Sequence, residues 1–258
     1  MKKQALCALL SALLLLLLFL PIAAEGKAVH WYCVRNKEHR QPTLPPDLAV
    51  VEKYDGYYLD RAHGDENSDR VIYLTFDAGY ENGNVAKILD ILQTEQVPAA
   101  FFLLEHFVNQ NHDLVCRMAN EGHLVCNHTA THKNLAHATK QEIAAELSRL
   151  EEACRGAGVA VAPYFRPPEG TFSEQMLASV KALGYKTVFW SSAHADWDNN
   201  KQPSPQRAMK ILTDNLHNGQ VLLLHPTSAT NVAILPELIA KLKSEGYRFG
   251  TLVELCSE

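Results

Sequence analysis

Short apolar runs recur along the chain from residue 70 to near its C-terminal end. Seven of these runs have the length and the apolar content of buried β-strands. They are VIYLTF (71–76), AAFFLL (99–104), HLVCNHT (123–129), YFRPP (164–168), KTVFWS (186–191), VLLLHP (221–226) and YRFGTL (247–252). The series predicts seven strands, and polar residues follow most of them.

Amphipathic segments separate the strand-like runs. In GNVAKILDILQTE (83–95) apolar residues fall at i, i+3, i+4 and i+7, which is one face of a helix, and QEIAAELSRLEEAC (141–154) repeats this spacing. Further helices are predicted at 175–183, 205–216 and 233–242. Strands that alternate with helices indicate parallel βαβ units, and seven units in about 190 residues suffice for a closed or nearly closed barrel. We therefore predict an α/β fold, a distorted (β/α)7-type barrel with parallel strands and outer helices.

The N-terminal segment differs from the rest of the chain. Lys2 and Lys3 precede an apolar stretch from Ala5 to Ala24 that ends in small residues. This order predicts a secretory signal peptide over residues 1–24, cleaved near Ala24. An uncleaved membrane anchor stays open as an alternative, because the stretch is near the ~20 residues that a spanning helix needs. Either outcome places the protein outside the cytoplasm, and the membrane is expected as a partner only through this segment.

Residues 25–69 contain PTLPP and the polar stretch DRAHGDENSDR, without a clear period. We expect an irregular N-terminal arm packed on a main domain of residues 70–258. The 258 residues are 47% hydrophobic, which is enough for a sizeable core. The formal charge of −5 and the absence of a basic run exclude nucleic acid as an expected partner. The sequence leaves the oligomeric state open.

Five cysteines follow the predicted signal peptide, and none of them forms a CxxC pair. They are Cys33, Cys116, Cys126, Cys154 and Cys256. An odd number without metal-binding spacing predicts neither a disulfide framework nor a structural zinc site. Most should be small buried hydrophobic residues, and one bridged pair stays open.

Polar residues that follow the predicted strands are candidates for a common site. They are Asp77, His128, His132, Arg166, Asp196 and His225. In parallel α/β barrels the active site lies at the C-terminal ends of the strands. We therefore expect these side chains to converge on one face.

The pair His128 and His132 has a spacing that suits a divalent metal. Two imidazoles at i and i+4 lie on one face of a helical turn. Among twelve histidines such a pair also arises by chance, so the spacing alone is a weak signal. Its place after an apolar strand favours a metal site.

The other polar residues fit acid–base chemistry. Asp77 could act as a general base or simply form a turn before Gly79. Arg166 could hold that carboxylate ionised. His225 could act as a general acid oriented by Asp196, or be a core histidine. Trp197 could form an apolar wall for an acyl group or a sugar face.

Five motifs in order resemble the polysaccharide deacetylase family, the NodB homology group of carbohydrate esterases. The motifs are TFDAG (75–79), HTATH (128–132), RPPEG (166–170), AHADW (193–197) and LLLH (222–225). The resemblance spans residues ~70 to 255. The segments between the motifs are similar to the delta-lactam-biosynthetic de-N-acetylases of the spore cortex. Those enzymes act on N-acetylmuramic acid in peptidoglycan that has lost its stem peptide.

The resemblance implies a role for each matching residue. Asp77 matches the base that activates water, Arg166 its partner, His225 the catalytic acid and Asp196 the carboxylate that tunes this acid. His128 and His132 match the metal-ligand histidines. The substrate-binding candidates are Tyr80, Pro167, Gly170 and Trp197. The expected activity is hydrolytic N-deacetylation of muramic acid in peptidoglycan glycan strands, in the cell wall or spore envelope.

Two positions depart from the family pattern. Ala78 stands where the family has a third metal ligand, and Ala193 where it has an aspartate. A catalytic zinc site usually has three protein ligands. We therefore expect a divalent metal, zinc or similar, and three outcomes stay open. The metal is held weakly, Glu81 or another nearby side chain takes the place of the missing ligand, or activity depends less on the metal. On this interpretation Ala78→Asp should raise the metal affinity.

Three alternative functions stay open at this point. The enzyme could deacetylate another glycan, such as chitin oligomers, xylan or intact peptidoglycan. The substitution at Ala78 could mark a cell-wall binding pseudoenzyme, although the acid–base set is complete. A purely structural barrel has least support, because polar residues gather at the predicted strand ends.

Overall fold

The computed structural model describes residues 26–35 and 38–257. The predicted signal peptide over residues 1–24 lies outside the described residues. Within the described ranges, no helix has both the length and the apolar character needed to cross a membrane.

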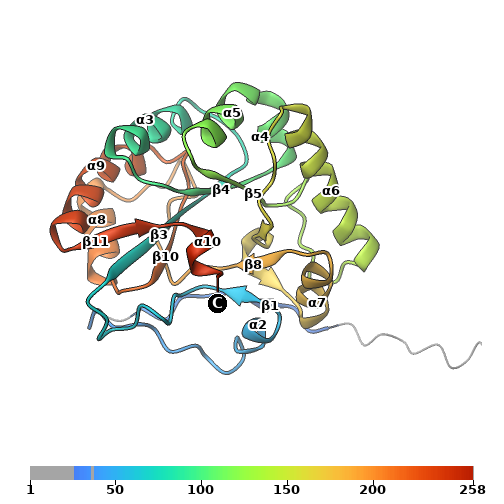
Figure 1. Cartoon of the computed structure of the whole chain (residues 1–258), viewed down its shortest axis with the longest axis horizontal. Coiled ribbons are helices and arrows are strands. Elements are labelled where there is room, and N and C mark those ends of the chain that lie inside the picture. Colours follow the sequence, from blue (N-terminus) through green and yellow to red (C-terminus); the bar gives the residue numbers. More distant parts are fainter. Residues whose placement is uncertain (1–25, 36–37, 258) are drawn as a thin grey trace, which may run out of the picture.

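A curved sheet of parallel strands forms the centre of the molecule, and helices cover its outer face (Figure 1). The strand order is β2-β8-β6-β5-β4-β3-β10-β9, with β11 paired to β3. The bounds are β2 Gly56–Tyr57, β3 Arg70–Ala78, β4 Ala100–Leu103, β5 Leu124–Asn127, β6 Tyr164–Phe165, β8 Lys186–Val188, β9 Ser192–Ala193, β10 Gln220–Leu224 and β11 Tyr247–Gly250. The sheet curls into an open barrel, so the predicted distorted (β/α)7-type fold is confirmed.

Strand β3 lies at the centre of the sheet and has three neighbours. Along one edge it pairs with β10 over Ile72–Phe76. Along the other edge, its first residues pair with β11 and its last residues with β4. The barrel thus splits beside β3. The split leaves the C-terminal end of β3 between β4 and β10.

The described α-helices from residue 140 onward begin with a side-chain N-cap. The bounds of the α-helices are α2 Val50–Lys53, α3 Val85–Glu95, α4 Glu105–Gln110, α5 His112–Asn120, α6 Lys140–Gly156, α7 Glu174–Ala182, α8 Pro205–Asp214, α9 Ala229–Ser244 and α10 Leu252–Leu255. Thr139 and Glu142 form a capping box at α6, and Ser173 caps α7. Five helices match the sequence prediction, whereas α4 and α5 between β4 and β5 were not predicted.

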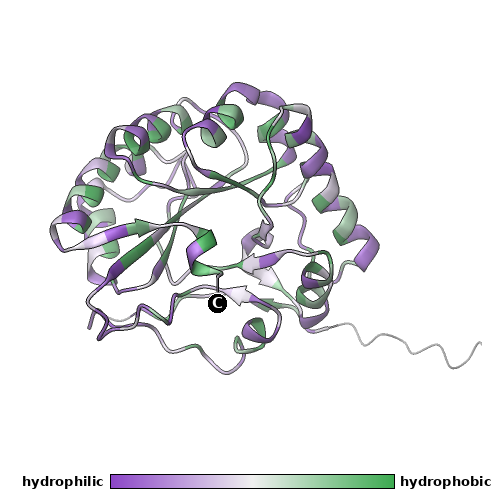
Figure 2. Ribbon diagram, viewed as in Figure 1, coloured by the Kyte–Doolittle hydropathy of each residue, from purple (hydrophilic) through white to green (hydrophobic). Residues whose placement is uncertain are grey.

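Successive residues of β3 face opposite sides of the sheet, as expected for a strand. Ile72, Leu74, Phe76 and Ala78 belong to the apolar cluster beneath the outer helices. Val71 and Tyr73 belong to the inner cluster, which also holds Leu252 and Leu255 of α10. Figure 2 shows the same division, with hydrophobic residues along the sheet and hydrophilic residues on the outer helix faces. Asp77 and Ala78 therefore occupy different sides of the sheet.

The N-terminal arm is more regular than predicted. Its β1 (Val29–His30) pairs antiparallel with β7 (Thr171–Phe172), and its β2 joins the main sheet beside β8. Trp31 stacks on Phe189 with ring centroids 4.4 Å apart and donates its Nε1–H to the carbonyl of Trp190. The expectation of an irregular arm is thus wrong in part, because two-residue strands leave almost no periodic signal in the sequence.

The cysteines after the predicted signal peptide are free thiols in the structure. Cys126, Cys154 and Cys256 are buried, and burial raises the pKa of each thiol. Cys33 and Cys116 are half-buried. The prediction of small buried residues therefore holds for three of the five, and none of the five forms a disulfide.

Candidate active site

A cavity of about 760 Å³ opens at the C-terminal ends of the strands. Its walls include Asp77, His128, His132 and His225, which come from three of the five predicted motifs. Arg166 and Asp196 lie directly behind this wall, bonded to Asp77 and His225. The structure therefore brings the six predicted polar residues together.

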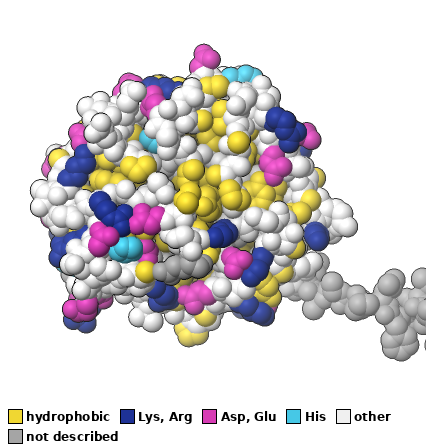
Figure 3. All heavy atoms as spheres, viewed as in Figure 1, with side chains coloured by type: hydrophobic (Ala, Val, Ile, Leu, Met, Phe, Trp, Pro, Cys, Tyr) yellow, Lys and Arg dark blue, Asp and Glu magenta, His cyan; other side chains and the backbone are white. Residues whose placement is uncertain are grey.

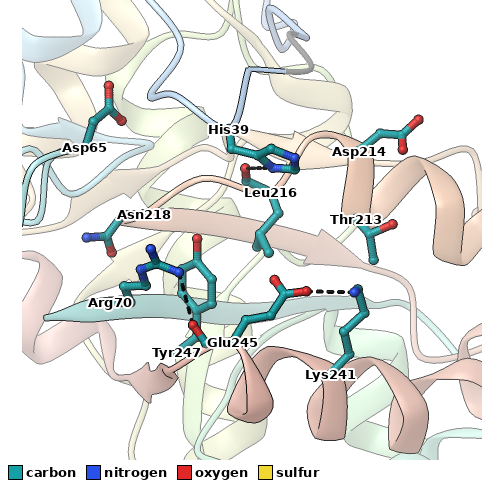
Figure 4. A pocket seen from close by; sticks show the side chains of 10 residues that line it. All are labelled: His39, Asp65, Arg70, Thr213, Asp214, Leu216, Asn218, Lys241, Glu245 and Tyr247. Carbon is teal, nitrogen blue, oxygen red and sulfur yellow. Dashed lines mark hydrogen bonds and ion pairs between the residues drawn. The ribbon is translucent and has the colours of Figure 1, made fainter. Parts of the chain in front are cut away.

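A second cavity, of about 540 Å³, lies at the opposite ends of the strands (Figure 4). It contains Arg70 at the start of β3 and Tyr247 at the start of β11. Arg70 donates to the carbonyl of Glu245, and the Glu245 side chain forms an ion pair with Lys241 at 2.7 Å. None of the predicted motif residues lines this cavity, so we do not assign the chemistry to it.

Arg166 is the largest fully buried side chain of the described residues, and it fixes Asp77. Its guanidinium donates to Asp77 Oδ1 at 2.8 Å, to Thr75 Oγ1 at 3.0 Å, and to the carbonyl oxygens of Val188 at 3.0 Å and Phe189 at 3.2 Å. Burial opposes ionisation of Asp77, but the charge of Arg166 helps to outweigh it, and the pKa of the carboxyl is lowered. Asp77 is therefore an ionised carboxylate beside the cavity.

Asp196 fixes His225 in a similar way. The His225 Nδ1–H donates to Asp196 Oδ1 at 2.8 Å, and the His225 backbone N–H donates to Oδ2 at 2.8 Å. Burial disfavours the imidazolium, but the bond to Asp196 outweighs burial and raises the pKa of His225. The imidazole Nε2 stays free of that bond. His225 can therefore carry a proton near neutral pH.

Asn231 at the start of α9 completes this network. Its side-chain amide donates to Asp196 Oδ2 at 2.6 Å and to the carbonyl of His225 at 3.0 Å. Its Oδ1 lies 2.9 Å from His194 Nε2 and accepts that N–H. The five motifs did not reveal Asn231, because it lies six residues after His225, in α9.

His128 and His132 lie side by side, with ring centroids 4.9 Å apart. His128 Nδ1–H donates to the carbonyl of Arg166 at 2.8 Å, so its Nε2 carries the lone pair, 3.6 Å from Asp77 Oδ2. Burial lowers the pKa of His128 to about 4, which keeps the ring neutral. The two rings lie on a loop after β5 and not on a helical turn, because Thr129 and His132 have φ of 77° and 59°.

Two positions decide how well a metal fits. Ala78 is 1% exposed, belongs to the outer apolar cluster and is not part of the cavity wall. Both oxygens of Glu81 accept backbone N–H groups, of Gly83 at 2.7 Å and Val85 at 3.0 Å, at the start of α3. Glu81 therefore does not replace the third ligand. Over residues 26–35 and 38–257 no three His, Cys, Asp or Glu side chains form a group that could hold a metal ion. The donors fit two-histidine ligation and not a complete three-ligand site.

The four predicted substrate-binding residues divide into two pairs. Trp197, 64% exposed, and Gly170 form part of the cavity wall, whereas Tyr80 and Pro167 do not. Gly170 has φ of 65°, and a Cβ there would lie 2.8 Å from the Trp190 ring. The Tyr80 hydroxyl accepts a hydrogen bond from Asn199 at 2.6 Å, in the loop after Trp197. Pro167 is buried.

The N-terminal arm supplies part of the wall that the motifs did not reveal. Trp31, Tyr32, Cys33 and Arg35 all line the cavity. They reach it because β1 pairs with β7, next to the turn that carries Gly170. The adjacent aromatic residues at 31 and 32, in a segment without a clear period, were the signal that could have found this wall.

Comparisons with known proteins agree with this geometry. A sequence profile described as polysaccharide deacetylase matches residues 64–188. The peptidoglycan-N-acetylmuramic acid deacetylase PdaA of Bacillus subtilis is 38% identical over 238 residues, which are 92% of this chain and 89% of that protein.

Solved structures give the same answer for the fold. The structure of Bacillus subtilis PdaA, a family 4 carbohydrate esterase, has a TM-score of 0.82 at 38% identity and covers 89% of this chain and 97% of that chain. A family 4 carbohydrate esterase from Bacillus anthracis has a TM-score of 0.73 at 33% identity and covers 90% of this chain and 97% of that chain.

Proposed function

The chain belongs to the polysaccharide deacetylase family, and we propose that it hydrolyses the N-acetyl group of N-acetylmuramic acid residues in peptidoglycan. It is a hydrolase that acts on N-acetyl amide bonds. One observation carries the proposal. An ionised carboxylate, Asp77, and a protonatable imidazole, His225, face the same cavity, each fixed by a buried partner. The similarity to the muramic acid deacetylase of Bacillus subtilis supports the choice of substrate.

Asp77 acts as the general base in this proposal. It accepts a proton from a water molecule, whose oxygen forms a bond to the acetyl carbonyl carbon. Arg166 keeps the carboxylate ionised before the reaction and holds Oδ1, which leaves Oδ2 for the water. The developing negative charge lies on the former carbonyl oxygen, so nearby hydrogen-bond donors or positive charge are needed to stabilise it.

His225 acts as the general acid. It donates its Nε2 proton to the sugar nitrogen as the carbon–nitrogen bond breaks, which releases acetate and leaves an amine on the sugar. Asp196 raises the pKa of His225 and stabilises the protonated ring. The bond from Nδ1 to Asp196 also aims Nε2 away from the carboxylate.

Deacetylases of this family are generally metal-dependent. We propose that His128 and His132 hold a divalent metal, zinc or similar, more weakly than a three-ligand site would. A bound metal would supply positive charge for the substrate carbonyl oxygen and lower the pKa of a bound water. The neutral state of His128 and its free Nε2 lone pair support this role.

Aromatic side chains at the rim support a polymer substrate. Trp197 and Tyr32 are 64% and 47% exposed beside the cavity, and exposed aromatic rings pack well on sugar faces. Peptidoglycan glycan strands lie outside the cytoplasmic membrane, so the proposal places the protein in the cell wall or spore envelope. The released amine would lie beside the lactyl carboxylate of the same sugar, and these are the two groups that a muramic delta-lactam joins.

Acetate release from defined glycans tests the proposal. We expect release from peptidoglycan glycan strands stripped of stem peptides, and much slower release from intact peptidoglycan, chitin oligomers and acetylxylan. Release from intact peptidoglycan but not from stripped strands would contradict it. Binding to stripped strands without acetate release, with and without added zinc, would support a glycan-binding pseudoenzyme.

A further inference from the structure

Arg35 of the N-terminal arm lines the same cavity as Asp77 and His225. Its Nη2 donates to the carbonyl of Ala193 in β9 at 3.2 Å. Strand β9 pairs with β10, whose next residue is His225, and Asp196 follows β9 by three residues. The Arg35 guanidinium is therefore hydrogen-bonded to the strand pair β9–β10, and His225, the proposed acid, directly follows β10.

Arg35 and Arg166 differ in how their guanidinium groups are paired. Arg166 is committed to Asp77 and to the core. Arg35 is exposed, and among the described residues no carboxylate forms an ion pair with it. A guanidinium has five N–H donors, so one bond to a carbonyl leaves donors available for a ligand. Glu169 is an exposed acid on the same wall. An anionic group in the cavity would be attracted to Arg35 and repelled by Glu169.

The proposed substrate carries such an anionic group close to the reacting amide. N-acetylmuramic acid differs from N-acetylglucosamine by a lactyl ether at C3, next to the acetamido group at C2, and this ether ends in a carboxylate. In intact peptidoglycan the stem peptide converts that carboxylate into a neutral amide. A planar guanidinium binds a carboxylate through two parallel hydrogen bonds and gains much less from an amide.

We infer that Arg35 binds the lactyl carboxylate of the muramic acid residue and thereby selects glycan strands without stem peptides. The inference rests on the proposed function. It assigns the preference for the free acid to one residue of the N-terminal arm. Arg35 is a specificity residue in this scheme and takes no part in proton transfer.

Two matched substrates test this role. One is a tetrasaccharide of alternating N-acetylglucosamine and N-acetylmuramic acid with free lactyl carboxylates, and the other carries primary amides at those carboxyls. For Arg35→Ala we expect KM to rise about tenfold on the free acid, with kcat within about twofold, because a charge-assisted bond is lost. On the amide we expect no change. Arg35→Lys should keep part of the preference, and Arg35→Glu should weaken binding of the free acid further.

Arg155→Ala provides a matched control, since Arg155 is an exposed arginine at the end of α6, outside the cavity. We expect it to match the wild type on both substrates. Thermal unfolding of each variant shows that it is folded, and Arg35→Lys keeps the test valid if Arg35→Ala is unstable.

The outcomes separate the two proposals. Equal kinetics of Arg35→Ala and the wild type, or equal losses on both substrates, would overturn the role of Arg35 while leaving muramic acid deacetylation intact. A wild type that releases acetate from chitin oligomers but from neither tetrasaccharide would overturn both.

Discussion

The two halves of the candidate site differ in how completely their side chains are hydrogen-bonded. The acid–base half consists of Asp77, Arg166, Asp196 and His225, and the histidine half consists of His128 and His132. In the acid–base half, Asp77 and Asp196 each accept bonds from buried partners, and Arg166 is fully buried with four hydrogen bonds. In the histidine half, His128 has one bond to a backbone carbonyl, and His132 lies on an exposed loop. The third metal-ligand position of the family is an alanine that faces the outer apolar cluster.

This difference follows from the cost of burying charge. A buried guanidinium or carboxylate without its partner is strongly destabilising, so the acid–base half must be complete for the protein to fold well. A neutral imidazole carries a much smaller penalty when a neighbouring ligand is missing. The histidine half can therefore lose a ligand with little effect on stability. Activity in this chain should accordingly depend more on the acid–base half.

The largest expected effect is that of Asp77→Asn. The amide keeps the shape of the side chain but cannot accept a proton from water, so kcat should fall by about 10²- to 10⁴-fold. The measurement is acetate release from stripped glycan strands, with circular dichroism as the folding control. A loss in kcat below about tenfold would show that Asp77 is not the base. It would also contradict the expectation that activity depends more on the acid–base half than on the histidine half.

Asp196→Asn tests the acid through pH. Protonated His225 is the active form, so activity should fall as pH rises through its raised pKa. Without the charge of Asp196, burial dominates and lowers the pKa of His225, so the alkaline limb of kcat/KM should move to lower pH. At neutral pH we expect a loss of roughly ten- to a hundredfold. If the alkaline limb of kcat/KM stays at the same pH in Asp196→Asn, a group other than His225 donates the proton.

The same residues show how far the sequence predicts the molecule. The seven apolar runs from residue 70 onward all became strands, because a buried strand needs a continuous apolar run. Polar residues that follow such runs were correctly expected to meet, because the C-terminal ends of parallel strands share one face.

Other features depend on tertiary contacts or on local geometry. Strand β2 exists through its partner β8, more than a hundred residues away in the chain. The helical turn expected for His128 and His132 is wrong, because β5 ends at Asn127 and the chain turns through positive φ at Thr129. Arg35 carries no local signal. The orientation of Ala78 could have been predicted, since adjacent strand residues alternate between faces.

Ala78→Asp addresses the histidine half directly. Because the methyl group lies in an apolar cluster, a carboxylate there should lower the free energy of unfolding by roughly 2 kcal/mol or more in the absence of metal. Ala78→Ser is a smaller polar control. Denaturant unfolding in a chelator gives the stability change. An unchanged stability would show that the new side chain reaches solvent or the cavity.

The same variant tests the expectation, made from the sequence, that an aspartate at 78 tightens metal binding. Zinc titration calorimetry of Ala78→Asp and the wild type measures this. Tighter zinc binding would mean that a side chain at 78 reaches the two imidazoles by local rearrangement of the strand end. An unchanged affinity would mean that position 78 does not face the metal.

The smallest effect on activity is expected for removal of the metal. Because the described part of the chain offers only two imidazoles as protein ligands at this site, zinc should bind weakly. A chelator should then reduce acetate release only several-fold, less than the loss in Asp77→Asn. His132→Ala removes one ligand from an exposed loop and should abolish zinc binding in calorimetry with little change in Tm. A chelator effect as large as that of Asp77→Asn would show that the histidine half is as important as the acid–base half.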